Sequence, residues 1–249
     1  MKNTSPKTVV SNEDIMSLLP GIPLTRQVLA NALETADDTQ RRFLYDLLVS
    51  ERESRYHSRI NRLMRAARFP SRKTFTGYDW SAITCPPDWG RKNLETLDFI
   101  DAHEDLVLYG DVGCGKTHLA IALGHAACLQ GIPVRFHTAA SLIGVLRHTQ
   151  ENHRLERELA TIAKTGLIII DELGYLLIDQ QGARLLYQVI ANAYENQSII
   201  YTSNLEFSRW GTALGDTPMA AAIIDRTVHH GRILRFEGTS YRVTHATMK

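Results

Sequence analysis

Residues 110–117 constrain the fold of this chain more than any other segment. They read GDVGCGKT, which fits the pattern G-x-x-x-x-G-K-[ST], and they directly follow the apolar run LVLY at residues 106–109. A strand that enters a glycine-rich loop and then a helix directs several backbone N–H groups and a helix N-terminus at one point, which suits a phosphate. The pattern predicts an α/β fold with a phosphate-binding loop. The alternative is a glycine-rich turn that contains a lysine by chance.

The residue types in this loop suit a nucleotide and its metal ion. Glycine permits positive φ and close approach of the backbone, Lys116 can reach the β- and γ-phosphates, and the Thr117 hydroxyl can bind Mg²⁺. Cys114 is either an oxidisable thiol or simply a small loop residue. The predicted nucleotide-binding residues are Gly110, Asp111, Val112, Gly113, Cys114, Gly115, Lys116 and Thr117.

Two further apolar runs end in polar residues suited to the same site. The run LIII at 167–170 is typical of a strand buried on both faces, and it ends in Asp171 and Glu172. We expect Asp171 to hold Mg²⁺ through water and Glu172 to polarise the water that attacks the γ-phosphate; the alternative is a pair of solvated acids. The strand expected at 198–202 is followed by Asn204, which could orient that water, although Ser-Asn is also an ordinary turn signal. Together these strand ends predict ATP hydrolysis.

The net charge of +1 hides a basic segment. Residues 1–75 contain thirteen Lys or Arg against eight Asp or Glu, whereas residues 76–249 contain fifteen against nineteen. The excess lies in the segment 51–73. In a helix that starts there and is ended by Phe69-Pro70-Ser71, six arginines would spread over one broad arc, and the opposite arc would be apolar. Guanidinium groups suit phosphates, so the arc predicts DNA binding; the alternatives are a solvated face or a protein-binding surface. The arginines are Arg52, Arg55, Arg59, Arg62, Arg65 and Arg68, and the apolar residues are Tyr56, Ile60, Leu63, Met64 and Ala67.

The chain divides by pattern into three parts. Apolar residues at three- and four-residue steps predict helices over 23–36 and 39–50, so residues 1–75 form a helical N-terminal domain with the basic helix. Residues 76–102 form a linker and lead-in segment. Phe75, just before it, and Tyr78 and Trp80 within it line either an adenine pocket or the core. From residue 106 strands and helices alternate, which predicts a parallel sheet covered by helices over 103–249.

Membrane segments are not indicated. No apolar run approaches the ~18 residues that a bilayer-spanning helix needs, and the first ten residues, MKNTSPKTVV, lack the apolar stretch of a signal peptide. The three cysteines lack the spacing of a disulfide framework or a zinc site. We therefore expect a cytoplasmic protein with no membrane partner.

Several motifs taken together resemble one family. The segments GDVGCGKTHLAIALG, LIIIDELGYL, YTSNL and the closing AAIIDR and GTSYR are similar to those of the IstB-like ATPases of bacterial insertion sequences, over about residues 40–245. That family consists of AAA+ transposition helpers, and helicase loaders of the DnaC type are its close relatives. The resemblance implies a three-layer AAA+ sandwich, ATP and Mg²⁺ as ligands, and ATP-dependent homo-oligomers on double-stranded DNA. It also implies a transposase, encoded by the same element, as partner.

The resemblance also assigns roles in the closing segment. Arg226, in a short helix expected at 220–228, is the candidate arginine finger for a neighbouring subunit's site, and Arg242 is a candidate second nucleotide sensor; surface salt-bridge arginines are the alternative. Only 45 residues follow Asn204, too few for the usual C-terminal helical lid domain.

The predicted function is that of a DNA-stimulated ATPase that helps transposition and binds DNA with little sequence preference, because phosphate contacts do not specify bases. A helicase loader is the alternative. A small-molecule kinase fits less well, since the chain shows no acceptor-binding segment.

Overall fold

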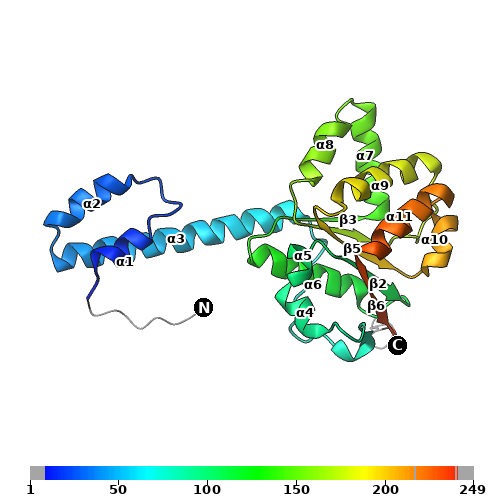
Figure 1. Cartoon of the computed structure of the whole chain (residues 1–249), viewed down its shortest axis with the longest axis horizontal. Helices are drawn as coiled ribbons and strands as arrows, with labels where there is room; N and C mark the ends of the chain where they lie inside the picture. Colours follow the sequence, from blue (N-terminus) through cyan, green and yellow to red (C-terminus); the bar gives the residue numbers. More distant parts are fainter. Residues whose placement is uncertain (1–8, 216, 239, 241–249) are drawn as a thin grey trace, which may run out of the picture. The chain divides into compact units, whose positions relative to one another are not determined.

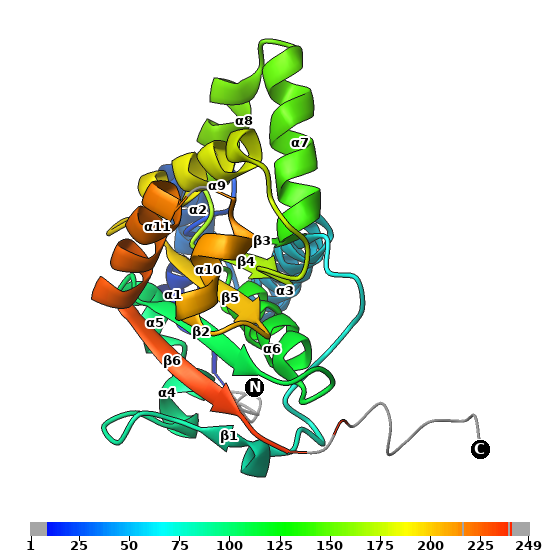
Figure 2. The same cartoon turned by 90° about the vertical axis from the view of Figure 1, so that its right-hand side faces the viewer.

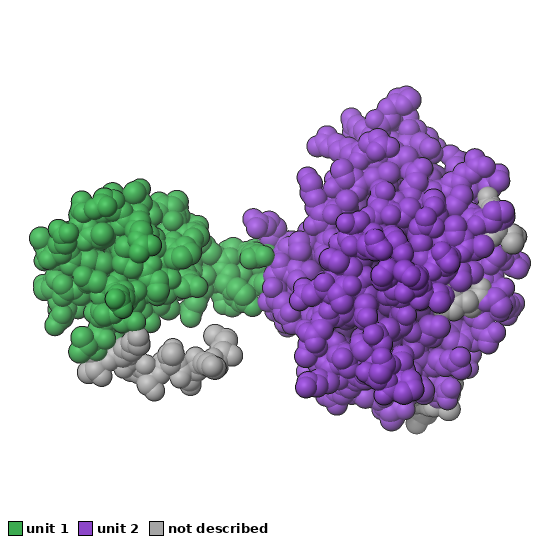
Figure 3. Space-filling model, viewed as in Figure 1, with its two compact units in different colours: residues 1–61 green, residues 62–249 purple. Residues whose placement is uncertain are grey.

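The computed structural model describes residues 9–215, 217–238 and 240. The chain forms two compact units, residues 1–61 and residues 62–249, coloured green and purple in Figure 3. The division falls within a single helix, α3 (Asp38–Ala67), and lies before the boundary that the sequence suggested at residue 75.

The first unit is a small helical body. Helix α1 (Asn12–Ser17) starts at a capping box in which Ser11 and Asp14 exchange backbone and side-chain hydrogen bonds. Helix α2 (Arg26–Thr35) follows, and the same reciprocal pattern links Asp37 and Gln40 at the start of α3. The small core of this unit consists of Val10, Ile15, Leu18, Leu29, Leu33 and Leu48.

Helix α3 is one 30-residue element, whereas the sequence suggested one helix over 39–50 and a separate basic helix from residue 51. No glycine, proline or cap interrupts the pattern at that junction, so nothing ends the first segment. The helix ends at Ala67 because Arg68 adopts a left-handed φ of 59°, and Arg135 donates to the Ala66 carbonyl. Within the described residues, none of the helices, this long and charged one included, has the apolar length that a bilayer crossing requires.

The second unit is built on a six-stranded sheet (Figures 1 and 2). All neighbouring strands are parallel except β1, which pairs antiparallel with β6. Strands β1 and β6 were not expected from the sequence, which indicated only the other four. In sheet order the strands are β1 (Ile83–Thr84), β6 (Gly231–Phe236), β2 (Asp105–Gly110), β5 (Ser198–Ser203), β4 (Leu167–Asp171) and β3 (Val134–Thr138).

Helices cover both faces of this sheet (Figure 1). One face carries α4 (Arg91–Thr96), α5 (Asp98–Asp101) and α6 (Lys116–Leu129), after a short 3-10 helix at Trp80–Ala82. The other face carries α7 (Ala139–Glu151), α8 (Leu155–Ile162), α9 (Gln180–Ala193), α10 (Phe207–Ala213) and α11 (Thr217–His229). The predicted three-layer α/β fold with a mainly parallel sheet is confirmed.

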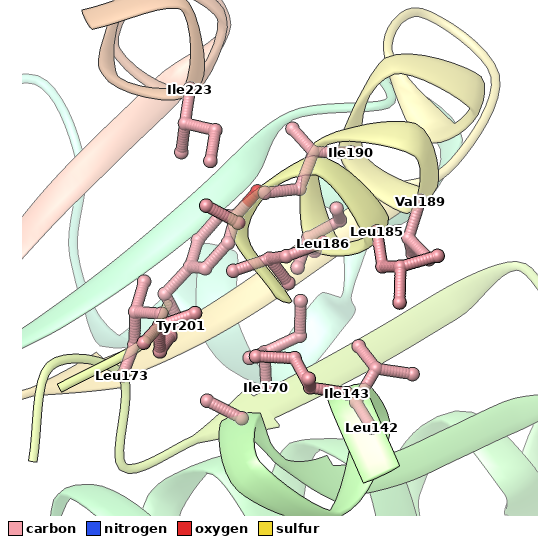
Figure 4. Close-up of a cluster of buried hydrophobic side chains, with 14 of the residues drawn as sticks. Leu142, Ile143, Ile170, Leu173, Leu185, Leu186, Val189, Ile190, Tyr201 and Ile223 are labelled. Carbon is pink, nitrogen blue, oxygen red and sulfur yellow. The ribbon is translucent and has the colours of Figure 1, made fainter. Parts of the chain in front are cut away.

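The strand sequences explain how one sheet fills two cores. Successive side chains of a strand point to opposite faces, so Leu167 and Ile169 of β4 enter one core while Ile168 and Ile170 enter the other. Figure 4 shows the second of these cores, where Ile170 lies among residues of α7, α9 and β5. A strand buried on both faces must be apolar throughout, as the run LIII is.

Candidate functional site

Three neighbouring strand ends form a cleft in the second unit. Strand β5 lies between β2 and β4, and all three are parallel, so the segments that follow them meet at one edge of the sheet. The cleft there has a volume of about 90 Å³. Its lining residues are Val112, Gly113, Lys116, Thr117, Glu172, Tyr175, Thr202, Ser203 and Asn204. Six of the residues that the sequence proposed for nucleotide binding and hydrolysis line this cleft, namely Val112, Gly113, Lys116, Thr117, Glu172 and Asn204.

The loop between β2 and α6 needs glycine at two positions in particular. A Cβ on Gly110 would lie 2.2 Å from the carbonyl oxygen of Phe236, so only glycine lets β2 run this close to β6. Gly115 has a φ of 91° and precedes the first residue of α6. Because Gly115 has no side chain with which to cap α6, the first N–H groups of the helix remain available for an anion.

Lys116 already lies over this loop. Its ammonium donates to the carbonyl oxygens of Gly110 and Asp111, at 2.7 and 2.6 Å. A triphosphate on the loop would offer the same ammonium stronger, charged acceptors. The lysine and the N-terminus of α6 therefore give the cleft a positive side.

Oxygen atoms from three elements converge on the other side of the cleft. Oδ1 of the buried Asp171 accepts from the hydroxyls of Thr117 (2.8 Å) and Thr202 (2.5 Å). Mg²⁺ prefers carboxylate and hydroxyl oxygen, and it usually binds through one carboxylate and the phosphates of its nucleotide. The Thr117–Asp171 pair fits that requirement, and these two residues would hold the ion.

The acid that follows Asp171 is held in an unusual backbone conformation. Glu172 has a φ of 60°, in the left-handed region of backbone conformation that residues other than glycine seldom adopt. Its exposed side chain lines both the cleft and an adjoining hollow of about 320 Å³. Asn204 is also exposed in the cleft. The neighbouring Ser203 hydroxyl donates to the Leu173 carbonyl at 2.8 Å and so ties the turn after β4 to β5.

Sequence reasoning missed Thr202 and Ser203 as members of this site. Both lie in a run rich in β-branched residues, where threonine is common for conformational reasons alone. Their position was the available signal. Thr202 ends the strand predicted at 198–202, Ser203 follows it, and the strand expected before this one in the chain ends in Asp171 and Glu172.

The aromatic residues of the lead-in segment pack behind the phosphate-binding loop. Tyr78 donates to the Gly115 carbonyl at 3.3 Å, and its ring contacts those of Trp80 and His118. Burial raises the pKa of the Tyr78 hydroxyl far above its ordinary value. Cys114 is buried as well and donates its S–H to the Gly238 carbonyl at 3.4 Å. These side chains support the loop from the core side.

Arg226 of the closing segment does not line the cleft. Arg226 lies on α11, where its guanidinium lies over the rings of Tyr187 of α9 and Tyr194 just after α9, 5.0 and 5.9 Å from the ring centroids. It also donates to the Ala222 carbonyl at 3.1 Å. Arg242 lies outside the described residues.

The six arginines of the predicted DNA-binding arc are all exposed on or just after α3. Arg55 pairs with Glu51 and donates to the Gly21 carbonyl at 2.6 Å. The apolar arc is less buried than expected. Ile60 and Ala67 are buried, but Tyr56 is 51% exposed because the helices of the first unit do not cover that turn of α3.

Comparison with known proteins agrees with this geometry. A family model described as IstB-like ATP binding protein matches residues 23–248. The ATP-binding protein of insertion sequence IS5376 from Geobacillus stearothermophilus is 37% identical over 225 residues, which cover 90% of each chain. The ATP-binding protein of insertion sequence IS21 from Pseudomonas aeruginosa is 38% identical over 206 residues, or 82% of this chain and 77% of that one.

Solved structures resemble the chain in fold. The crystal structure of DnaI aligns with a TM-score of 0.52 at 18% identity, over 69% of this chain and 91% of its own. A DNA replication initiation factor aligns with a TM-score of 0.51 at 16% identity, over 67% of this chain and 50% of its own. At this level of identity the likeness shows the fold alone, a mainly parallel sheet with helices on both faces.

Proposed function

The chain belongs to the family of IstB-like ATP-binding proteins of insertion sequences, and from this premise we propose that it is a DNA-stimulated ATPase that helps transposition. The observation that carries the proposal is the cleft in which Lys116, the Thr117–Asp171 pair and Glu172 meet. A site that only held a nucleotide would not need the second acid, whereas hydrolysis needs a group that polarises water.

Each residue of the cleft has a role in this proposal. Lys116 and the N–H groups at the start of α6 bind the β- and γ-phosphates of ATP. Thr117 and Asp171 hold Mg²⁺, which neutralises charge on the phosphates when it is bound. Glu172 accepts a proton from the attacking water, and the Asn204 amide orients that water. Arg242 remains the candidate for a second nucleotide contact.

Arg226 acts in this proposal on the site of a neighbouring copy. It is absent from the lining of its own chain's cleft and sits on α11, on the surface of the second unit. A guanidinium brought to the γ-phosphate by another subunit would stabilise transition-state charge and make hydrolysis depend on assembly. The active species would then be a homo-oligomer that forms with ATP.

The exposed arginines of α3 supply the contact with double-stranded DNA. Guanidinium groups bind backbone phosphates, which position a protein on the duplex without reading its sequence. The candidates in and just after this helix are the six exposed arginines Arg52, Arg55, Arg59, Arg62, Arg65 and Arg68. The transposase of the same element is the proposed protein partner, and the proposed place of action is the cytoplasm, where the DNA lies.

The proposal is tested by measuring phosphate release from Mg²⁺-ATP with and without duplex DNA. We expect the parent protein to turn over ATP faster with DNA, and Glu172→Gln to bind ATP without hydrolysing it. No phosphate release above the level of Glu172→Gln, under either condition, would refute the proposed activity. Binding to a replicative helicase in place of duplex DNA would favour the helicase-loader alternative.

A further inference from the structure

Thr202 makes an unusual set of contacts across the sheet. Its hydroxyl donates to Asp171 Oδ1 at 2.5 Å and accepts from the Glu172 N–H at 3.0 Å. Its carbonyl oxygen accepts from the next N–H along the chain, that of Leu173, at 2.9 Å. One residue of β5 therefore bonds three consecutive residues at the end of β4.

These contacts explain how Glu172 keeps its conformation. A left-handed backbone costs a residue with a side chain about 1–2 kcal/mol, and such a residue persists only where its surroundings determine it fully. The two N–H groups on either side of the Glu172 α-carbon are both bound by Thr202. Without the hydroxyl, the Glu172 N–H would lose its acceptor, and the turn would be free to relax to an ordinary φ.

The same hydroxyl fixes the direction of its own proton. Because it accepts from the Glu172 N–H, the Thr202 hydroxyl directs its hydrogen toward Asp171 Oδ1. That oxygen also accepts from Thr117. One oxygen atom, that of the Thr202 hydroxyl, therefore links the Asp171 carboxylate to the backbone of Glu172.

We propose that Thr202 is a positioning residue for hydrolysis, which aligns Asp171 and Glu172 through its hydroxyl. This inference rests on the proposed ATPase function. It concerns the geometry of the two acids and predicts that loss of the hydroxyl affects turnover more than nucleotide binding, since Thr202 bonds neither Lys116 nor the helix N-terminus. A misplacement of a catalytic group by ~1 Å costs about a hundredfold in rate.

The test compares three variants by steady-state ATP hydrolysis. Thr202→Val removes the hydroxyl and keeps the shape, and we expect kcat to fall about 10- to 100-fold with KM changed less than about 3-fold. Thr202→Ser restores a hydroxyl at the same place and should return kcat to within about 3-fold of the parent.

The matched control is Thr165→Val. The Thr165 hydroxyl is also buried, donates to the Ile162 carbonyl and accepts from Gln197, but it lies before β4 at the opposite end of that strand from the cleft. Its loss should lower stability in a similar way and leave kcat unchanged. Equal losses of kcat in the two valine variants, or no rescue by serine, would overturn the proposal. If Thr202→Val does not fold, Thr202→Cys, a weaker hydrogen-bonding partner, takes its place with an expected kcat below that of Thr202→Ser.

A second readout does not depend on turnover. In calorimetric titrations with the non-hydrolysable analogue AMPPCP, Mg²⁺ should improve binding to the parent and to Thr202→Ser more than to Thr202→Val, since Asp171 is aligned only in the first two. An equal effect of Mg²⁺ on all three would count against Thr202. If the parent itself proved unable to hydrolyse ATP, the proposed function would fail, and this titration alone would decide the role of Thr202.

Discussion

Asp105 gives a quantitative prediction about stability. This carboxyl lies at the start of β2, at the opposite end of the strand from the phosphate-binding loop, and is only 9% exposed. Burial raises its pKa from 3.8 to about 8, although the hydrogen bond from the Ile199 N–H, at 2.7 Å, acts in the opposite direction. The folded protein therefore holds a proton on Asp105 that the unfolded chain releases at much lower pH.

The sign of the effect follows from proton linkage. A folded-state pKa above the unfolded value gives a stabilising contribution that is complete below pH 3.8 and is lost as the pH rises toward about 8. Between those limits the contribution falls by about 1.4 kcal/mol per pH unit. Asparagine keeps an oxygen acceptor for Ile199 but does not titrate. The stability of Asp105→Asn relative to the parent should therefore rise by about 3 kcal/mol between pH 5 and pH 7.

Tryptophan fluorescence in urea is a suitable assay, because all three tryptophans, Trp80, Trp89 and Trp210, belong to the second unit. The free energy of unfolding is measured at several pH values for the parent, for Asp105→Asn and for Asp101→Asn, which makes the same change at an exposed position. Parallel pH profiles for the parent and Asp105→Asn would refute the assignment of a buried, protonated carboxyl. A profile changed equally by Asp101→Asn would show that the effect is not specific to burial.

Three further predictions concern function. Lys116→Ala should lose ATP binding by calorimetry while Glu172→Gln retains it and loses turnover; equal binding defects would contradict the separate roles of the two residues. Arg226→Ala should bind ATP normally and hydrolyse it slowly, and mixing it with Glu172→Gln should restore part of the activity; no rescue in assemblies shown intact by light scattering would argue against action on a neighbouring subunit. Replacing three exposed α3 arginines with glutamine should flatten the plot of log affinity for duplex DNA against log salt by roughly 2–3 units, for all sequences alike. An unchanged slope in a folded variant would remove this helix from the DNA contact. These arginines are Arg52, Arg59 and Arg62.

The parallel core of the fold could be predicted because its signals are local. Four strand-like segments that alternate with helical patterns indicated β2, β3, β4 and β5, and the loop motif located the cleft. Strand β6 carries no such signal, since it places charged residues within a short apolar run. Arg232 of β6 is matched by Glu104 and Asp88, partners more than 120 residues away in the chain. Only the assembled sheet reveals that pairing.

Three further differences between the predicted and the observed structure concern the length of α3, the exposure of Tyr56 and the contacts of Thr202. The extent of α3 depends on the absence of a stop between two segments that each looked helical, and the exposure of Tyr56 depends on which turns the first unit covers. The contacts of Thr202 depend on the adjacency of β4 and β5, because threonine in a strand carries no mark of a positioning role.

The position of β5 in the middle of the sheet bears on how the chain is made. Strands β2 and β4 are synthesised first, yet they do not touch, since β5 lies between them. An emerging chain that ends between Glu172 and Ser198 therefore has the phosphate-binding loop and both acids before it has the strand that lies between β2 and β4. Ligands stabilise only the state that binds them, so the complete ATP site can stabilise the chain only once β5 has been made. Its stabilising effect begins when β5 inserts, late in translation.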